Sequence, residues 1–146
     1  MNVIPADASA WIDVRTTPSV DHRLLVAEMH ALAAAVAANH DIATQLLVID
    51  DRPSVATDET HRLVRAVWDA HTAVASAAPR LGGVPGSTDG TILTSLTGMA
   101  SVVYGPGGKW IAHQADEFVE IDDIVQHAKV YVEAARRFLT GAAATA

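Results

Sequence analysis

The order of helix-like and strand-like segments constrains the fold of this chain more than any other sequence feature. Residues 1–56 predict a strand, a helix and a second strand. The two strands are predicted at Ser9–Arg15 and Ile42–Ile49. Between them, apolar residues at helical spacing predict a helix that starts at Ser19 or Asp21 and ends near Asn39. This order is typical of half of a small two-layer α+β unit.

Residues 57–146 follow a different pattern, in which helices and strands alternate. The predicted elements are a helix over 57–77 capped by Thr57 or Asp58, a strand over 79–84, a helix over 88–96, a strand over 99–105 and a helix over Ile121–Thr140. The last helix has a predicted apolar face made of Ile124, Val125, Ala128, Val132 and Phe138. Such alternation predicts a three-layer α/β sheet. The expected fold class is therefore α/β, with an α+β unit before it.

Composition narrows the possible functions. The chain is 50% hydrophobic and 18% charged, which indicates a folded domain. A net charge of -7 argues against a nucleic-acid partner, because such a surface needs clustered Lys and Arg. The chain has no cysteine, so a metal would have to be held by His, Asp or Glu. With no secretory signal and no apolar run long enough for a membrane span, we expect a soluble cytoplasmic protein without a membrane partner.

His113 is the strongest single candidate for a functional residue. It follows a predicted buried strand and the glycine turn 105–108, at the edge where open α/β sheets bind ligands. A metal or catalytic role and an ordinary exposed loop histidine both fit this position. The six other histidines lie on predicted helices or at their ends without an HxxxH pair, as surface histidines commonly do.

Two further segments suggest recognition of an anion. The loop "GSTDG", Gly86–Gly90, leads into a helix whose N-terminal N–H groups favour a carboxylate, although Ser87 or Asp89 also fits a simple N-cap. Arg15 could bind a substrate carboxylate with two hydrogen bonds, or pair with its neighbour Asp13. Neither alternative is settled by the sequence.

Three signatures taken together resemble a known enzyme family. They are "NVIPADASAWIDVRTTP", "GVPGSTDGTIL" and "VVYGPGGKWIAHQADEFVEIDDI". In this order they resemble the C-terminal half of the zinc amidohydrolases and metallopeptidases that include acetylornithine deacetylase, succinyl-diaminopimelate desuccinylase, aminoacylases and glutamate carboxypeptidases. The similarity extends from Asn2 to about Leu139. The resemblance implies an α/β catalytic domain with two zinc ions and an inserted βαββαβ lid and dimerisation domain.

The resemblance also implies roles for parts of the chain. Residues 1–56 would be the second half of the lid, and residues 57–146 the C-terminal part of the catalytic domain. His113 would be the last zinc ligand. Residues that would bind or line the substrate are Asn2, Arg15, Ser87, Thr88, Asp89 and Gly107. The implied reaction is hydrolysis of the amide bond of an N-acyl amino acid or small peptide by metal-activated water, in a homodimer.

Other parts of the family pattern do not occur in this sequence. The family's HxD pair and its Glu-Glu pair, which carries the general base, are absent. Because a catalytic zinc usually needs three protein ligands, we expect the chain to lack a complete catalytic set and to be inactive without the N-terminal half of the catalytic domain. We interpret Asp116 and Glu117 as residues that lead into the following helix or form hydrogen bonds. The alternative is a non-catalytic module that associates through unpaired strand edges.

Overall fold

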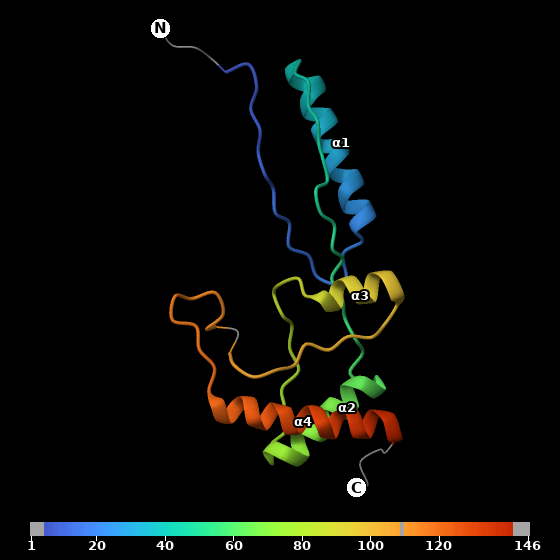
Figure 1. Ribbon diagram of the computed structural model, residues 1–146. Coiled ribbons are helices and arrows are strands. Elements are labelled where there is room, and N and C mark those ends of the chain that lie inside the picture. The colour runs from blue at the N-terminus through green and yellow to red at the C-terminus, as the bar shows by residue number, and fades with distance from the viewer. Residues whose placement is uncertain (1–4, 109, 142–146) are drawn as a thin grey trace. The chain divides into compact units, whose positions relative to one another are not determined.

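The computed structural model describes residues 5–108 and 110–141, and four helices form within them (Figure 1). The helices are α1 (His22–His40), α2 (Arg62–Ala75), α3 (Asp89–Thr97) and α4 (Ile121–Thr140). The chain divides into two compact units, Met1–Ser54 and Val55–Ala146. The assignment of these two parts to a lid and to a catalytic domain stays a prediction. No helix in the described part of the chain is long and apolar enough to cross a membrane.

None of the predicted strands forms within the described residues, so the structure shows helices of the predicted α/β fold without its sheet. The segments 9–15, 42–49, 79–84 and 99–105 run between the helices without forming a strand. A strand requires hydrogen bonds to a neighbouring strand, whereas an apolar β-branched sequence only favours extended backbone. The regular structure of the described residues is therefore helical, whereas the sequence predicted a sheet as well.

Helix α1 confirms its predicted start. The Asp21 side chain is the N-cap, and its Oδ1 accepts hydrogen bonds from the N–H groups of Arg23 at 2.8 Å and Leu24 at 3.4 Å. These backbone donors lower the pKa of Asp21. The helix ends at His40. Its C-cap, Asp41, has a left-handed backbone (φ 50°), which lets the following N–H, that of Ile42, donate to the carbonyl of Ala37 at 3.2 Å.

A polar cluster joins the three segments of the first unit. Nδ1 of His22 lies 2.5 Å from Oδ1 of Asp51, and Nε2 of the same ring lies 2.8 Å from Oγ1 of Thr16. The hydroxyl of Ser54 donates to the carbonyl of Thr16 at 2.7 Å. Helix α1 has no fully buried residue, and polar contacts connect it to its flanking segments: this cluster, and the Thr44 hydroxyl, which donates to the carbonyl of Ala33 at 3.2 Å.

The second unit has its core between α2 and α4, which lie side by side (Figure 1). Three residues form the buried cluster, Ala70, Val130 and Ala134, with Val67, Val74 and Tyr104 packed against it. Two of the three are alanines, whose small side chains allow close approach of the helices. At one end of the pair, the guanidinium of Arg62 lies 4.0 Å from the ring centroid of Phe138 and adds a cation–π contact.

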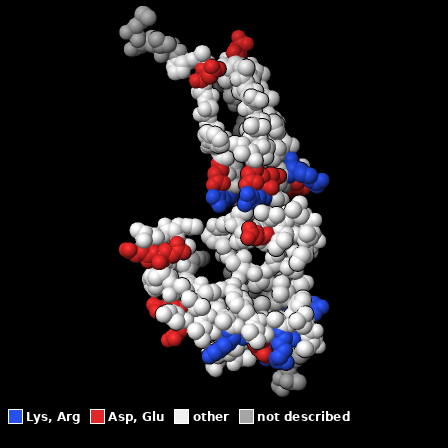
Figure 2. All heavy atoms as spheres, in the orientation of Figure 1, with Lys and Arg blue, Asp and Glu red and all other residues white. Residues whose placement is uncertain are grey.

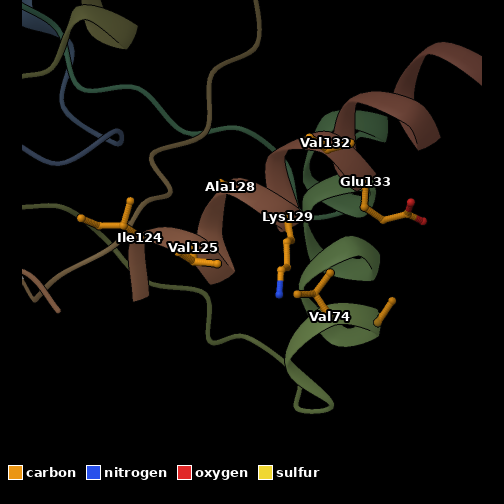
Figure 3. A pocket seen from close by; sticks show the side chains of 8 residues that line it. Val74, Ile124, Val125, Ala128, Lys129, Val132 and Glu133 are labelled. Atoms are coloured by element: carbon orange, nitrogen blue, oxygen red, sulfur yellow. The ribbon is translucent and has the colours of Figure 1, made fainter. Parts of the chain in front are cut away.

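Four residues of the predicted apolar face of α4, Ile124, Val125, Ala128 and Val132, do share one side of the helix, but that side lines a groove and is not the buried cluster. Ile124, Val125 and Val132 are 44%, 47% and 72% exposed, whereas Val130 is fully buried. The exposed residues line one side of an apolar groove beside α2, with Val74 on the other side and only Lys129 and Glu133 charged (Figure 3). Helix α4 thus has two apolar stripes, and spacing alone does not indicate which one meets α2.

The start of α2 also differs from the prediction. The N-cap is His61, whose Nδ1 accepts a hydrogen bond from the N–H of Leu63 at 3.2 Å. The two predicted caps have other partners. Thr57 donates to the carbonyl of Ser101 at 2.6 Å, and Asp58 accepts from the N–H and hydroxyl of Thr60. These hydroxyl and amide donors lower the pKa of Asp58.

The chain exposes more surface than a globular protein of its size. Its accessible area is 11844 Å², whereas a 15.3 kDa monomer exposes about 7,100 Å² and two separate globules of these lengths about 8,500 Å². Much of the excess is apolar, including Trp11, Leu24, Leu32, Leu47, Ile49, Leu81 and Leu96. On the face in Figure 2, broad uncharged areas separate the charged groups. An apolar surface of this extent is typical of a chain that packs against further protein.

Candidate functional site

His113 lies in the connection between the segment 99–105 and α4. Its side chain is exposed, and its backbone has a left-handed φ of 65°. Its N–H donates to Oε2 of Glu117 at 3.0 Å. For a residue other than glycine, a left-handed backbone costs about 1–2 kcal/mol. The carboxylate of Glu117 partly offsets this cost, because a charged acceptor strengthens the hydrogen bond. The interpretation of Glu117 as a hydrogen-bonding residue is confirmed.

Gly107 forms a second corner in the same connection. Its φ is 84°, a value that glycine adopts without steric cost, and its N–H donates to Oδ2 of Asp123 at 2.6 Å. Any larger residue would be strained at this φ, even though a Cβ would meet only Val119 at 3.8 Å. Glycine at this position is therefore required by the backbone. Its predicted contact with a substrate stays a prediction.

Asp123 connects this corner to the helical core. Its Oδ1 lies 2.9 Å from Nδ1 of His127, one turn further along α4. The imidazole of His127 packs on the ring of Tyr104, with 4.9 Å between centroids, and the Tyr104 hydroxyl lies 2.7 Å from Nδ1 of His71. Burial raises the pKa of Tyr104, with smaller contributions from Tyr131 and Asp123. Sequence analysis missed this network, because no spacing rule brings the four side chains together.

The predicted anion loop leads into α3, but its cap differs from the expected one. Thr88 is the N-cap, without a side-chain capping hydrogen bond, and Asp89 is the first helical residue. Neither Ser87 nor Asp89 is the cap. A carboxylate in the first turn of a helix interacts favourably with the helix dipole and stabilises the helix, which gives Asp89 a structural role. The substrate contacts predicted for Ser87, Thr88 and Asp89 stay predictions.

Helix α3, which follows this loop, is held against the segment 99–105 by hydroxyl contacts. Oγ1 of Thr94 lies 3.1 Å from Oγ of Ser101, and the N–H of Ser101 donates to Oγ1 of Thr57 at 3.2 Å. A Cβ on Gly90 would lie 3.0 Å from the Cβ of Ser101, so glycine allows α3 to approach this segment. The start of α3 is thus held against the segment that leads to the His113 connection.

Arg15 pairs with its neighbour in the chain. Its Nε and Nη2 donate to Oδ2 of Asp13 at 3.0 and 2.7 Å, and the two side chains are 73% and 70% exposed. This is the local alternative considered from sequence. An exposed pair of this kind contributes little to stability, and the predicted contact of Arg15 with a substrate stays a prediction. The other predicted residue of this part, Asn2, lies outside the described residues.

The described residues do not by themselves form a metal site. Within residues 5–108 and 110–141, no three His, Asp or Glu side chains converge to hold an ion. His113 presents one imidazole, and the Glu117 oxygen next to it already accepts a backbone hydrogen bond. A catalytic zinc usually takes three protein ligands. The donor set of this chain therefore does not fit a catalytic zinc without further ligands.

Comparison with known proteins identifies a family. The family model described as Peptidase family M20/M25/M40 matches residues 43–137. The Succinyl-diaminopimelate desuccinylase of Caulobacter vibrioides (strain NA1000 / CB15N) is 31% identical over 140 residues, which are 94% of this chain and 34% of that protein. The Probable succinyl-diaminopimelate desuccinylase of Staphylococcus aureus (strain MSSA476) is 23% identical over 141 residues, with the same coverage. The chain thus spans about a third of the length of these relatives. No solved structure matches.

Proposed function

The chain belongs to peptidase family M20/M25/M40, and we propose that it is the C-terminal portion of a zinc-dependent hydrolase. The bond cleaved would be the amide bond of an N-acyl amino acid or small peptide. The observation that carries this proposal is His113, which lies in the matched span 43–137 and is held in a left-handed conformation. Strained backbone conformations are common at functional sites, where surrounding contacts maintain them.

His113 would be one of several metal ligands. A bound zinc ion would supply a water molecule of lowered pKa as the nucleophile. This chain would contribute one imidazole toward that site, and the remaining ligands would come from outside these 146 residues. The chain alone would then be inactive, since one imidazole holds a zinc ion only weakly.

The substrate contacts would come from the N-terminal segment and from two loops. Arg15 would exchange Asp13 for a substrate carboxylate, which its planar guanidinium can bind with two hydrogen bonds. Asn2 would assist it, while Ser87, Thr88, Asp89 and Gly107 would line the pocket. The relatives' names make succinyl-diaminopimelate, an N-acyl amino acid, the first substrate to try.

The exposed apolar surface supports the proposal that the chain binds a protein partner. The segments 79–84 and 99–105 would become strands by pairing with the N-terminal half of the catalytic domain, which would complete the α/β sheet. Residues 1–56 would belong to a lid that forms a homodimer. The apolar groove beside α4 would also be covered (Figure 3). We place the reaction in the cytoplasm, which suits a chain without cysteine.

The same surface favours one alternative, a non-catalytic module that acts through association. In that case the excess area would be buried against a partner, and His113 would bind no metal. The two functions differ in whether the assembled protein hydrolyses an amide.

Co-expression tests the proposal. The chain would be produced together with the part of the Caulobacter vibrioides relative that lies outside the matched third, and the pair would be purified with zinc. We expect hydrolysis of N-succinyl-diaminopimelate by the pair and none by either polypeptide alone. Release of succinate would be measured, with other N-acyl amino acids as a panel.

The controls separate failure of assembly from failure of the proposal. Circular dichroism and co-elution would show that the pair is folded and assembled. A folded, assembled pair that hydrolyses no member of the panel would favour the association module. Hydrolysis by the chain alone at the rate of the pair would contradict the need for outside ligands.

A further inference from the structure

Two carboxylates hold the two left-handed corners of the connection that carries His113. At the first corner, the N–H of Gly107 (φ 84°) donates to Oδ2 of Asp123 at 2.6 Å. At the second, the N–H of His113 (φ 65°) donates to Oε2 of Glu117 at 3.0 Å. Each acceptor lies C-terminal to its corner. The two corners are therefore fixed by side chains that follow them in the chain, Glu117 before α4 and Asp123 in the first turn of α4.

The first carboxylate is itself held in place. Its other oxygen, Oδ1 of Asp123, lies 2.9 Å from Nδ1 of His127, and the same nitrogen lies 2.8 Å from the backbone carbonyl oxygen of Asp123. The His127 ring packs on Tyr104. Tyr104 packs against the α2–α4 core and bonds His71 through its hydroxyl. Rotation of the Asp123 side chain would break the hydrogen bond from the Gly107 N–H and move Oδ1 away from the His127 ring. The Gly107 corner is thus connected to the most buried part of the unit.

We infer that Asp123 and Glu117 are positioning residues, which set the backbone corners from which His113 is presented. This inference rests on the proposed function, because the direction of the His113 imidazole matters only if it is a ligand. The engaged oxygens of both side chains accept backbone N–H groups, so neither residue is assigned as a general base. Support of a ligand by a second set of side chains is a general requirement of metal sites.

Amide hydrogen exchange in the isolated chain tests the two hydrogen bonds. We expect Asp123→Ala to accelerate exchange of the Gly107 amide by about 10-fold or more, since a hydrogen bond to a charged group is lost. Glu117→Ala should do the same for the His113 amide. The matched controls are Asp122→Ala and Asp116→Ala, which remove neighbouring carboxylates and keep both bonds. Asp123→Asn keeps an acceptor and should restore protection of Gly107.

Turnover by the co-purified pair tests the positioning role. We expect Asp123→Ala and Glu117→Ala to lower kcat by about 10-fold or more, with KM and Tm nearly unchanged. Unchanged exchange at Gly107 and His113 in the alanine variants would overturn the inference, and so would faster exchange with unchanged kcat. If the pair is inactive with the unsubstituted chain, the proposed function fails and the positioning role falls with it. The exchange rates would then still show whether the carboxylates hold the corners.

Discussion

Replacement of His113 by alanine should abolish hydrolysis by the co-purified pair, with a loss of at least about 100-fold in kcat/KM. Mutation of residues that hydrogen-bond to metal ligands typically lowers metal affinity or activity about 10- to 100-fold, and loss of a ligand itself should lower activity by no less. The variant should fold normally, because the His113 side chain is exposed and alanine removes no packed group. The measurement is succinate release at saturating zinc.

The matched control for this variant is His30→Ala, which removes an exposed histidine on α1. It should leave hydrolysis unchanged, which would show that the effect of His113→Ala is specific to the imidazole of His113. If His113→Ala keeps most of the activity of the unsubstituted pair, His113 is not a ligand. The proposal would then lose the observation that carries it.

Introduction of a charge at Val130 should unfold the second unit. Val130 is fully buried between α2 and α4, and an aspartate at this position would have to lie unpaired in an apolar core or open the helix pair. We expect a loss of about 3 kcal/mol or more in the free energy of unfolding. The measurement is urea unfolding followed by circular dichroism.

Val132→Asp is the matched control, because the same substitution is made two residues away at a side chain that is 72% exposed. It should change the free energy of unfolding by about 0.5 kcal/mol or less. Equal effects at the two positions would contradict the packing of α2 on α4. Since Val132, and not Val130, belonged to the face predicted from spacing, this pair of variants also decides between the two apolar stripes of α4.

The helices were largely predictable from the sequence, and the sheet was not. Helix α4 begins and ends at the predicted residues, Ile121 and Thr140, and α1 begins after a predicted cap, Asp21. Helical hydrogen bonds join residues four apart, so their pattern is contained in the local sequence. Strand hydrogen bonds join distant segments. The segment 99–105 has a strand-like composition, but no strand forms along it.

The sequence drew attention to Gly107 and His113 but did not predict the geometry of the connection that holds them. Glycine at 107 and histidine at 113 were evident as a motif, and the positive φ at Gly107 agrees with the turn chemistry of glycine. The positive φ at His113 was not evident, because it is maintained by a side chain, Glu117, that only the folded connection brings to the amide. The contact between Asp123 and Gly107 spans 16 residues and follows no local rule.

Zinc content measured after dialysis tests the central claim most directly, namely that this chain supplies part of a metal site and not a whole one. The isolated chain and the co-purified pair would be dialysed against the same buffer, and zinc would be counted per chain. We predict substoichiometric zinc on the isolated chain and stoichiometric zinc on the pair, lost again with His113→Ala. One zinc ion or more retained by each isolated chain would contradict the account.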